Sequence, residues 1–422
     1  MANSFIIEQI FIIEQIKPRM ILDSRGVPTV EVDIKLRGSN AIGRCSVPSG
    51  SSVGSKEALE LRDNDDDKQW HGKGVSKVIG NISNIIAPKV VGRTFTTQKE
   101  LDDLLINLDG TPNKNKLGAN GILGVSLAFA KACASASNKE LYQFIGQSAL
   151  LPTPYFNVIN GGKHADNGLD IQEFMIVPHG IKTFAKQLQA GSEIFHSLKK
   201  LLIKNNLSIN VGDEGGFAPD ISNAKAALDL TCQAVEDAGY QLGGEVSIAL
   251  DVAASEFYIN KKYDLPGEGI VVNSAGLCHY LEELCKSYPI HSIEDSHHET
   301  DYDGWQQMTE LLGNTHQIVG DDIFVTNTDL ISYGIAHKIA NCVLIKPNQI
   351  GTLTETINAI NLAHNNGYKT MMSHRSGETE DTTIAHIAVA MGCGQIKSGS
   401  LSRSERMCKY NELSRIEEML NI

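Results

Sequence analysis

The sequence predicts an α/β protein in which a smaller N-terminal α+β domain precedes a C-terminal (β/α)8-type, TIM-like barrel. Its 422 residues are enough for about two or three domains. In the second part of the chain, short apolar runs recur, and each ends in a polar residue and precedes a helical pattern. The last residues of successive runs lie 43, 27, 25, 28 and 23 positions apart, which is typical of strand–helix units. The 272 residues from 151 to 422 match one barrel of about 250 residues.

The N-terminal part contains signals for both strands and helices. The hexapeptide FIIEQI occurs twice, at Phe5–Ile10 and Phe11–Ile16. We interpret this as a local duplication in which one copy forms the first strand and the other a frayed or added edge. Alternating apolar and polar residues in TVEVDIKL, within residues 21–36, predict a half-buried strand. Helical patterns follow in KEALELRD, residues 56–63, and in the Ala-rich segment 119–136.

The change from one domain to the other is expected near GQSALLPTP, residues 146–154, where a helical pattern stops at two prolines. We therefore predict an N-terminal capping domain over residues 1–148 and a barrel over residues 149–422. The expected barrel strands are VSIALD (246–251), HSIED (291–295), QIVGDD (317–322), CVLIKP (342–347), KTMMSH (369–374) and GQIKSG (394–399). A doubly wound sheet is less well supported, because no G-x-G-x-x-G or Walker A loop is present.

Composition and charge exclude several classes of function. The 37 basic and 50 acidic residues give a net charge of −13, which argues against nucleic-acid binding but not against an anionic substrate. No apolar run approaches the roughly 18 residues that a membrane span needs, and the N-terminus is a poor secretory signal. The eight cysteines show no C-x-x-C spacing. They are expected to be reduced thiols in a cytoplasmic protein.

Three consecutive predicted strands end in carboxylates, namely Asp251, Glu294 and Asp321. Oxygen-rich sites suit a hard cation, Mg²⁺ above all. A single Asp at such a position is more often a helix N-cap, but three acids in register favour a metal site. The next strand ends at Lys346, which could balance this charge. It could instead be a general base, if burial and nearby cations lower its pKa.

Other polar residues are expected around the same barrel mouth. Lys397 is a candidate second cation. The run His374-Arg375-Ser376 offers an imidazole, a guanidinium fork and a hydroxyl, which together suit a phosphate or carboxylate clamp. Two Gly-flanked loops also contain candidate groups and could be ordinary turns or a lid over substrate. These groups are Asp213 and Glu214 in VGDEGG, and His164, Gln172 and Glu173 in NGGKHADNGLDIQEFMI.

These motifs resemble the enolase (phosphopyruvate hydratase) family of the bacterial type. The matching strings follow the family's order from Ile21 to about Glu417. They are ILDSRG, VPSG, EALELRD, KLGAN, ILGVSLA, NVINGGKHADN, QEFMIVP, VGDEGGFAP, IALD, ASEFY, SIED, VGDD, NQIGTLTET, SHRSGETEDT, GQIK and SRSER. The resemblance implies a barrel of the enolase kind and the reversible dehydration of 2-phospho-D-glycerate to phosphoenolpyruvate in glycolysis, with two Mg²⁺ ions.

The resemblance also implies a role for each matching residue. Lys346 would be the base that removes the C2 proton, and Glu214 the acid that protonates the leaving C3 hydroxyl, with Glu173 and His164 beside it. The first Mg²⁺ would be held by Asp251, Glu294 and Asp321, and the second by Ser52 together with substrate phosphate. Arg375 and Ser376 would clamp the phosphate, and the further substrate contacts would be Gln172, His374 and Lys397.

The family pattern further suggests a homodimer or octamer, in which Arg19 pairs with Glu405 across an interface. A second role as a surface or scaffold protein is the alternative to catalysis, with an added cell-surface or secreted pool. The intact catalytic positions favour the enzyme. The sequence departs from the family pattern at Val27, Ser51, Val53, Pro347 and Ser296-His297-His298, and none of these changes removes a catalytic group.

Overall fold

The computed structural model describes residues 6–51, 54–64, 69–221 and 223–420. The N-terminal part forms a four-stranded antiparallel sheet of order β3-β2-β1-β4, covered by helices on one face. Its strands are β1 (Ile6–Leu22), β2 (Pro28–Leu36), β3 (Ile42–Ser46) and β4 (Thr94–Thr97). Its helices are α1 (Ser76–Asn81), α2 (Ala87–Val90), α3 (Gln98–Asp109), α4 (Ala119–Ala136) and α5 (Leu141–Ile145), with a π-helical segment over Ile82–Ile86 and a 3₁₀ turn over Trp70–Gly72.

The predicted half-buried strand is confirmed as β2, whose inward side chains at Val30, Val32, Ile34 and Leu36 are buried. The interpretation of the duplicated hexapeptide is wrong from Ile6 onward, because both copies lie in the single strand β1. This strand is long enough to pair with β4 near its start and with β2 from Ile13 onward. Phe5 lies outside the described residues.

The helix predicted over residues 56–63 is also wrong, because this segment is irregular. Several of its backbone N–H groups donate to carbonyls that are distant in the sequence. Ala58 donates to Gln349 and Leu59 to Asn113, each at 2.8 Å. These contacts outweigh a local helical pattern, which is only a weak preference when tertiary partners compete for the same backbone groups.

The predicted Ala-rich helix is confirmed as α4. By length and composition alone it could cross a membrane, but 83% of it is buried inside the protein. It packs on the sheet closely enough that a Cβ added at Gly43 of β3 would lie 2.0 Å from the Ala128 carbonyl oxygen. Its apolar residues therefore form the core of the N-terminal part.

The C-terminal part is a closed eight-stranded barrel of order β11-β12-β13-β14-β15-β5-β6-β7. Its strands are β5 (Thr153–Asn160), β6 (Glu173–Val177), β7 (Ser247–Asp251), β11 (Ile290–Glu294), β12 (Gln317–Gly320), β13 (Cys342–Ile345), β14 (Lys369–Ser373) and β15 (Gln395–Lys397). The six predicted strands are confirmed. β5 and β6 were not predicted, and β6 runs antiparallel to both its neighbours while the other pairs are parallel.

Helices surround the barrel, and the connection after β7 carries a small sheet of β8 (Tyr258–Ile259), β9 (Lys262–Leu265) and β10 (Ile270–Val272). The helices are α6 (Phe184–Lys204), α7 (Ala224–Asp237), α8 (Ser274–Ser287), α9 (Tyr302–Leu312), α10 (Thr328–Ala336), α11 (Pro347–Ile350), α12 (Leu353–Asn365), α13 (Thr383–Ala390) and α14 (Ser404–Leu420). Two 3₁₀ turns span Gly162–His164 and Ala254–Phe257.

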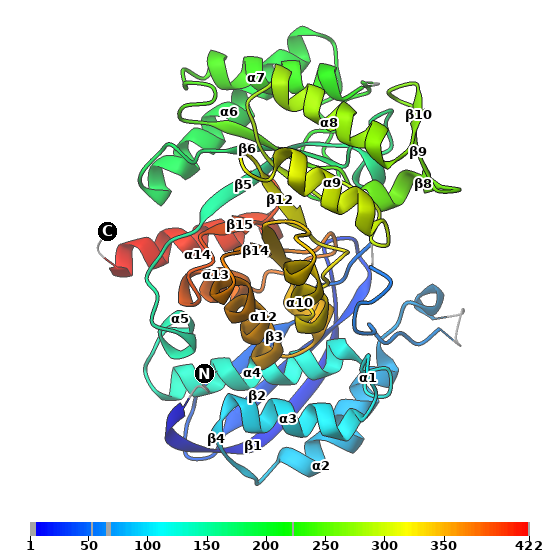
Figure 1. Cartoon of the computed structure of the whole chain (residues 1–422). Coiled ribbons are helices and arrows are strands. Elements are labelled where there is room, and N and C mark those ends of the chain that lie inside the picture. The colour runs from blue at the N-terminus through cyan, green and yellow to red at the C-terminus, as the bar shows by residue number, and fades with distance from the viewer. Residues whose placement is uncertain (1–5, 52–53, 65–68, 222, 421–422) are drawn as a thin grey trace.

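The N-terminal sheet and helices, blue to cyan in Figure 1, gather at one end of the molecule, and the α6–α9 side of the barrel lies at the other. The two parts are joined by polar contacts at the loops that follow β13 and β14. Ser49 and Gly377 exchange backbone hydrogen bonds, and Lys131 of α4 forms an ion pair with Asp381 at 2.7 Å. The N-terminal part therefore covers the end of the barrel where its parallel strands terminate.

Candidate active site

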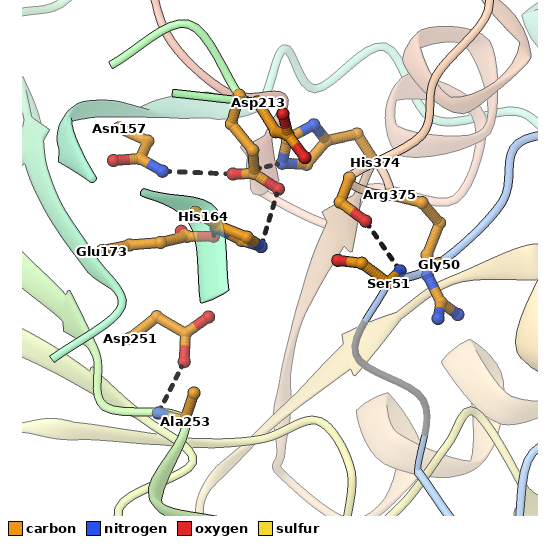
Figure 2. Close-up of polar contacts among 12 residues, drawn as sticks. Gly50, Ser51, Asn157, His164, Glu173, Asp213, Asp251, Ala253, His374 and Arg375 are labelled. Atoms are coloured by element: carbon orange, nitrogen blue, oxygen red, sulfur yellow. Dashed lines mark hydrogen bonds and ion pairs between the residues drawn. The ribbon is translucent and has the colours of Figure 1, made fainter. Parts of the chain in front are cut away.

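A polar cavity lies at this covered end of the barrel. It brings together eleven of the thirteen residues to which the resemblance gives a role. These are His164, Gln172, Glu173, Glu214, Asp251, Asp321, Lys346, His374, Arg375, Ser376 and Lys397. Glu294 is buried next to the cavity and contacts Lys397, whereas Ser52 lies outside the described residues. Figure 2 shows part of the group, with His164 and Glu173 on one side and Arg375 on the other.

Two buried lysines contact the strand-end carboxylates. Lys397 Nζ lies 2.7 Å from Glu294 Oε1, 3.1 Å from Asp251 Oδ2 and 3.2 Å from Glu173 Oε2. Lys346 Nζ lies 2.5 Å from Asp321 Oδ2. Burial alone lowers the pKa of each lysine, but the carboxylates outweigh it and raise both pKa values. The sequence suggested that burial and nearby cations could lower the pKa of Lys346. With Asp321 as its partner, this pKa is instead raised.

Acidic residues at this end of the barrel could hold a divalent cation, and one of the three predicted ligands, Asp321, belongs to such a group. Glu294 Oε2 is buried and has no hydrogen-bond partner among the described residues, so it has a free acceptor at the cavity. The group of Asp321 also contains Asp295 and Asp322, and its ligand atoms lie within 4.8 Å of one another. Hard oxygen donors of this kind suit Mg²⁺ or a similar ion. These acidic groups could therefore hold a metal.

Asp295 and Asp322 were not predicted as site residues, although each directly follows a predicted metal ligand in SIED or VGDD. Asp295 accepts hydrogen bonds from the backbone N–H groups of Asp321 and Asp322, at 2.8 and 3.2 Å. Burial and the adjacent Asp321 raise the pKa of Asp322 to about 8. Gln349, also not predicted, donates to Asp321 Oδ1 at 2.9 Å. These contacts orient the carboxylate of Asp321.

A second group contains two carboxylates with an imidazole between them. His164 Nδ1 lies 3.5 Å from Glu173 Oε1, and His164 Nε2 lies 3.7 Å from Glu214 Oε1. Burial and the charge of Glu214 raise the pKa of Glu173 well above its ordinary value. Burial also raises the pKa of Glu214, but His164 and His374 outweigh this and lower it well below its ordinary value. Of these two carboxyl groups, Glu173 therefore holds a proton more strongly than Glu214.

Glu214 has two further polar neighbours that hold its carboxylate. Asn157 Nδ2 donates to Glu214 Oε2 at 3.1 Å, and His374 Nε2 lies 3.3 Å from the same oxygen. Burial lowers the pKa of His374 to about 4, so its imidazole is neutral near pH 7. Glu214 thus occupies a fixed position on the cavity wall.

The predicted clamp residues lie where the two parts of the protein meet. Arg375 forms an ion pair with Glu57 at 2.8 Å, and Ser376 Oγ accepts a hydrogen bond from the backbone N–H of Ser51 at 2.8 Å (Figure 2). A Cβ added at Gly50 would lie 1.8 Å from Arg375 Nη2, so a larger residue there would displace the guanidinium. The N-terminal part therefore contacts both clamp residues directly.

Among the departures from the expected pattern, Val53 lies outside the described residues, whereas Pro347, Ser296 and His297 can be placed. Pro347 is the first residue of α11, where its missing N–H costs little, and it follows an extended Lys346. Ser296 and His297 are buried, and His297 Nε2 lies 3.2 Å from the Ser274 carbonyl oxygen. Neither lines the cavity.

Comparison with known families gives two matches. Residues 13–145 match the family model "Enolase, N-terminal domain", and residues 148–422 match "Enolase, C-terminal TIM barrel domain". Together the two matches span nearly the whole chain, which therefore belongs to the enolase family and has the fold of an enolase-type lyase.

Proposed function

From this membership of the enolase family, we propose that the chain catalyses the reversible dehydration of 2-phospho-D-glycerate to phosphoenolpyruvate and water. The observation that carries the proposal is the arrangement of one cavity. Its lining includes Lys346, Arg375 and carboxylates that could hold a cation. It also includes the group formed by Glu173, His164 and Glu214. Such a cavity combines a base, an acid and positive charge, which are the groups that removal of a proton next to a carboxylate requires.

Lys346 is the proposed base for the C2 proton. Its Nζ must be neutral when it accepts this proton, yet its contact with Asp321 raises its pKa. If the Asp321 carboxylate also bound a cation, it would stabilise the charged form of Lys346 less, and Lys346 would release its proton more easily. Lys397 remains protonated among three carboxylates, so it supplies fixed positive charge near the developing anion.

Asp251, Glu294 and Asp321 are the proposed ligands of one Mg²⁺, and Ser52 with substrate phosphate of a second. The unpartnered oxygen of Glu294 supports the first assignment. When bound, these ions would act as Lewis acids that neutralise charge on the substrate carboxylate. Sites of the enolase superfamily generally place a Lys or His base beside one or two Mg²⁺ ions, and this set of residues fits that known pattern.

Glu214 is the proposed acid that gives a proton to the leaving C3 hydroxyl. In the structure its pKa is lowered, whereas that of Glu173, on the other side of His164, is raised. The imidazole of His164 lies between the two carboxylates, 3.5 Å from Glu173 Oε1 and 3.7 Å from Glu214 Oε1. This supports one joint acid function for Glu173, His164 and Glu214.

Arg375 and Ser376 are the proposed phosphate clamp, and Gln172, His374 and Lys397 the further substrate contacts. All five line the cavity. A guanidinium is well suited to a phosphate because its N–H groups form a planar fork. We also propose that the protein works in the cytoplasm, with a further cell-surface or secreted pool, and assembles as a homodimer or an octamer.

The purified protein should convert 2-phosphoglycerate to phosphoenolpyruvate in the presence of Mg²⁺. The ultraviolet absorbance of the enol phosphate product reports the reaction directly. Chelation of Mg²⁺ should stop it, and Lys346→Ala should lack it while keeping the far-ultraviolet circular dichroism of the parent. A folded, Mg²⁺-loaded protein that forms no product would refute the proposed function.

A further inference from the structure

Arg406 is a buried cation that lies behind the cavity and has no role in the proposed chemistry. It belongs to the first turn of α14, and its side chain is fully buried. Its guanidinium donates to the carbonyl oxygens of Arg375 and Ser376, each at 2.5 Å, and of Asp213 at 3.1 Å. One side chain thus joins the loop that carries the proposed clamp to the loop that carries Glu214.

The fourth contact of Arg406 is chemically the most informative. Its Nη1 lies 2.6 Å from Nδ1 of His374. A guanidinium has only N–H donors, so Nδ1 of His374 must be the acceptor. A neutral imidazole that accepts at Nδ1 has its proton on Nε2. That nitrogen lies 3.3 Å from Glu214 Oε2, the carboxylate proposed as the acid.

We propose that Arg406 is a positioning residue that fixes His374 in the Nε2–H tautomer, so that His374 presents a proton, and not a lone pair, to Glu214. This inference rests on the proposed function, because it concerns the acid of that reaction. In the other tautomer, the bare Nε2 would repel the Glu214 carboxylate or take its proton. Loss of Arg406 should therefore impair protonation of the leaving hydroxyl more than removal of the C2 proton by Lys346.

Lys409 provides a matched control on the same helix. It is also a buried cation, and it donates to Glu378 Oε2 at 2.8 Å and to the Thr379 carbonyl oxygen at 2.5 Å. It therefore supports the chain just beyond the clamp loop without contacting His374. Substituting Lys409 disturbs a buried charge network of the same kind, so it measures what structural damage alone does.

The direct test is ¹⁵N NMR of the imidazole nitrogens in the full-length, histidine-labelled protein without substrate, with His374→Asn used to assign the signal. In the parent protein and in Lys409→Gln, His374 should be protonated on Nε2 near pH 7. In Arg406→Gln the signal should shift toward a mixture of tautomers. The tautomer of His374 in the parent protein can be measured without any variant, so the proposal can still be overturned if Arg406→Gln does not fold. Arg406→Lys keeps an N–H donor and provides a second, milder variant.

Activity supplies the second readout. In D₂O, Arg406→Gln should lose dehydration of 2-phosphoglycerate by about 10-fold or more relative to its C2 exchange, part of the 10²–10⁴-fold that a general acid contributes. Lys409→Gln should keep the parent ratio. A parent His374 protonated on Nδ1, or the same ratio in both variants, would overturn the positioning role. A parent protein that dehydrates no substrate would instead overturn the proposed function, and the tautomer measurement would still stand.

Discussion

The two cavity lysines carry the same charge but have different surroundings. Lys397 contacts three carboxylates, which raise its pKa well above its ordinary value, so it stays charged. Lys346 forms an ion pair with Asp321, which raises its pKa against the opposing effects of burial, Arg375 and Lys397. Lys397 is therefore held by three carboxylates and Lys346 by one, and a neutral Lys346 requires that the influence of Asp321 be weakened.

At the scale of single residues, Asp321→Asn should weaken Mg²⁺ binding by roughly 10²-fold, because the number of charged ligands changes the affinity of such sites over orders of magnitude. Isothermal titration calorimetry measures the affinity. Asp102→Asn is the control, since Asp102 is equally buried but lies in α3, outside the cavity. Parent-like activity of Asp321→Asn at micromolar Mg²⁺ would rule out this ligand.

Most candidate residues could be predicted from their place at a strand end. Glu173 is different, because it begins β6 instead of ending it. Since β6 is antiparallel to β7, its first residue pairs with Asp251, the last residue of β7, and so reaches the cavity. A search for polar residues at the ends of parallel strands could not place it. The Gly-flanked loop marked it only as a candidate, and the resemblance gave it a role. The contact between Arg375 and Glu57 could not be predicted either, because 318 positions separate the two residues.

At the scale of the elements, hydrophobic patterns predicted a helix or strand correctly where that element buries one face. They failed where contacts with distant segments determine the backbone conformation. β2 and α4 follow their patterns because each has a continuous apolar surface against the other. Residues 56–63 have a helical pattern but cross the domain contact, where their backbone groups find partners in other segments. Strand β5 is buried along almost its whole length, so it shows no alternation from which a strand could be identified.

The packing of α4 on the sheet gives a prediction for this scale. Gly43→Ala should destabilise the protein by about 1–3 kcal/mol, because the added methyl group would press on the Ala128 carbonyl and force the helix from the sheet. Gly80→Ala in α1 is the control, since its nearest neighbour would be 3.9 Å away. The free energies of unfolding of the two variants, measured in denaturant, should differ clearly. Equal stabilities would contradict the close contact.

At the scale of the whole molecule, the N-terminal part is held on the barrel by buried ion pairs. Asp381, paired with Lys131, has its pKa lowered to about 2, because Lys131 and Thr383 outweigh the opposing effect of burial. A carboxyl whose pKa is lower in the folded state stabilises that state when ionised. The ionised Asp381 contributes about 2 kcal/mol to the free energy of unfolding. This contribution is fully present above pH 3.8, the pKa of Asp381 in the unfolded chain, and is lost as the pH falls toward 2.

Asp381→Asn should therefore be less stable than the parent by about 2 kcal/mol at pH 7, and the difference should shrink between pH 4 and pH 2. Denaturant unfolding across this range measures it. Asp103→Asn, which removes an exposed partner of Lys99, should have little effect at any of these pH values. A pH-independent difference for Asp381→Asn would show that the charge of Asp381 is not the cause.

The proposed pairing of Arg19 with Glu405 in a dimer concerns the same scale. Within one chain Arg19 contacts Glu31 and Asp33, so Arg19→Glu also introduces local repulsion. Arg44 shares these partners, lying 2.7 Å from Asp33, and Arg44→Glu is therefore the matched control. Breaking a partly buried interface pair from one side costs about 3–5 kcal/mol.

In sedimentation at low concentration, Arg19→Glu should shift the protein toward monomer, Arg44→Glu should not, and Arg19→Glu with Glu405→Arg should restore the assembly. Equal shifts for Arg19→Glu and Arg44→Glu would assign the effect to repulsion within the chain. An unchanged profile for Arg19→Glu would count against the pairing.

The central claim is that Lys346 and Glu214 carry out separate proton transfers in one cavity. NMR of 2-phosphoglycerate incubated in D₂O with each variant reads both steps. Lys346→Ala should abolish product formation and C2 exchange together, because no other group removes that proton. Glu214→Gln should lose dehydration by about 10²–10⁴-fold yet keep measurable exchange, because base and clamp remain. Exchange by Lys346→Ala together with none by Glu214→Gln would show that the two roles are reversed.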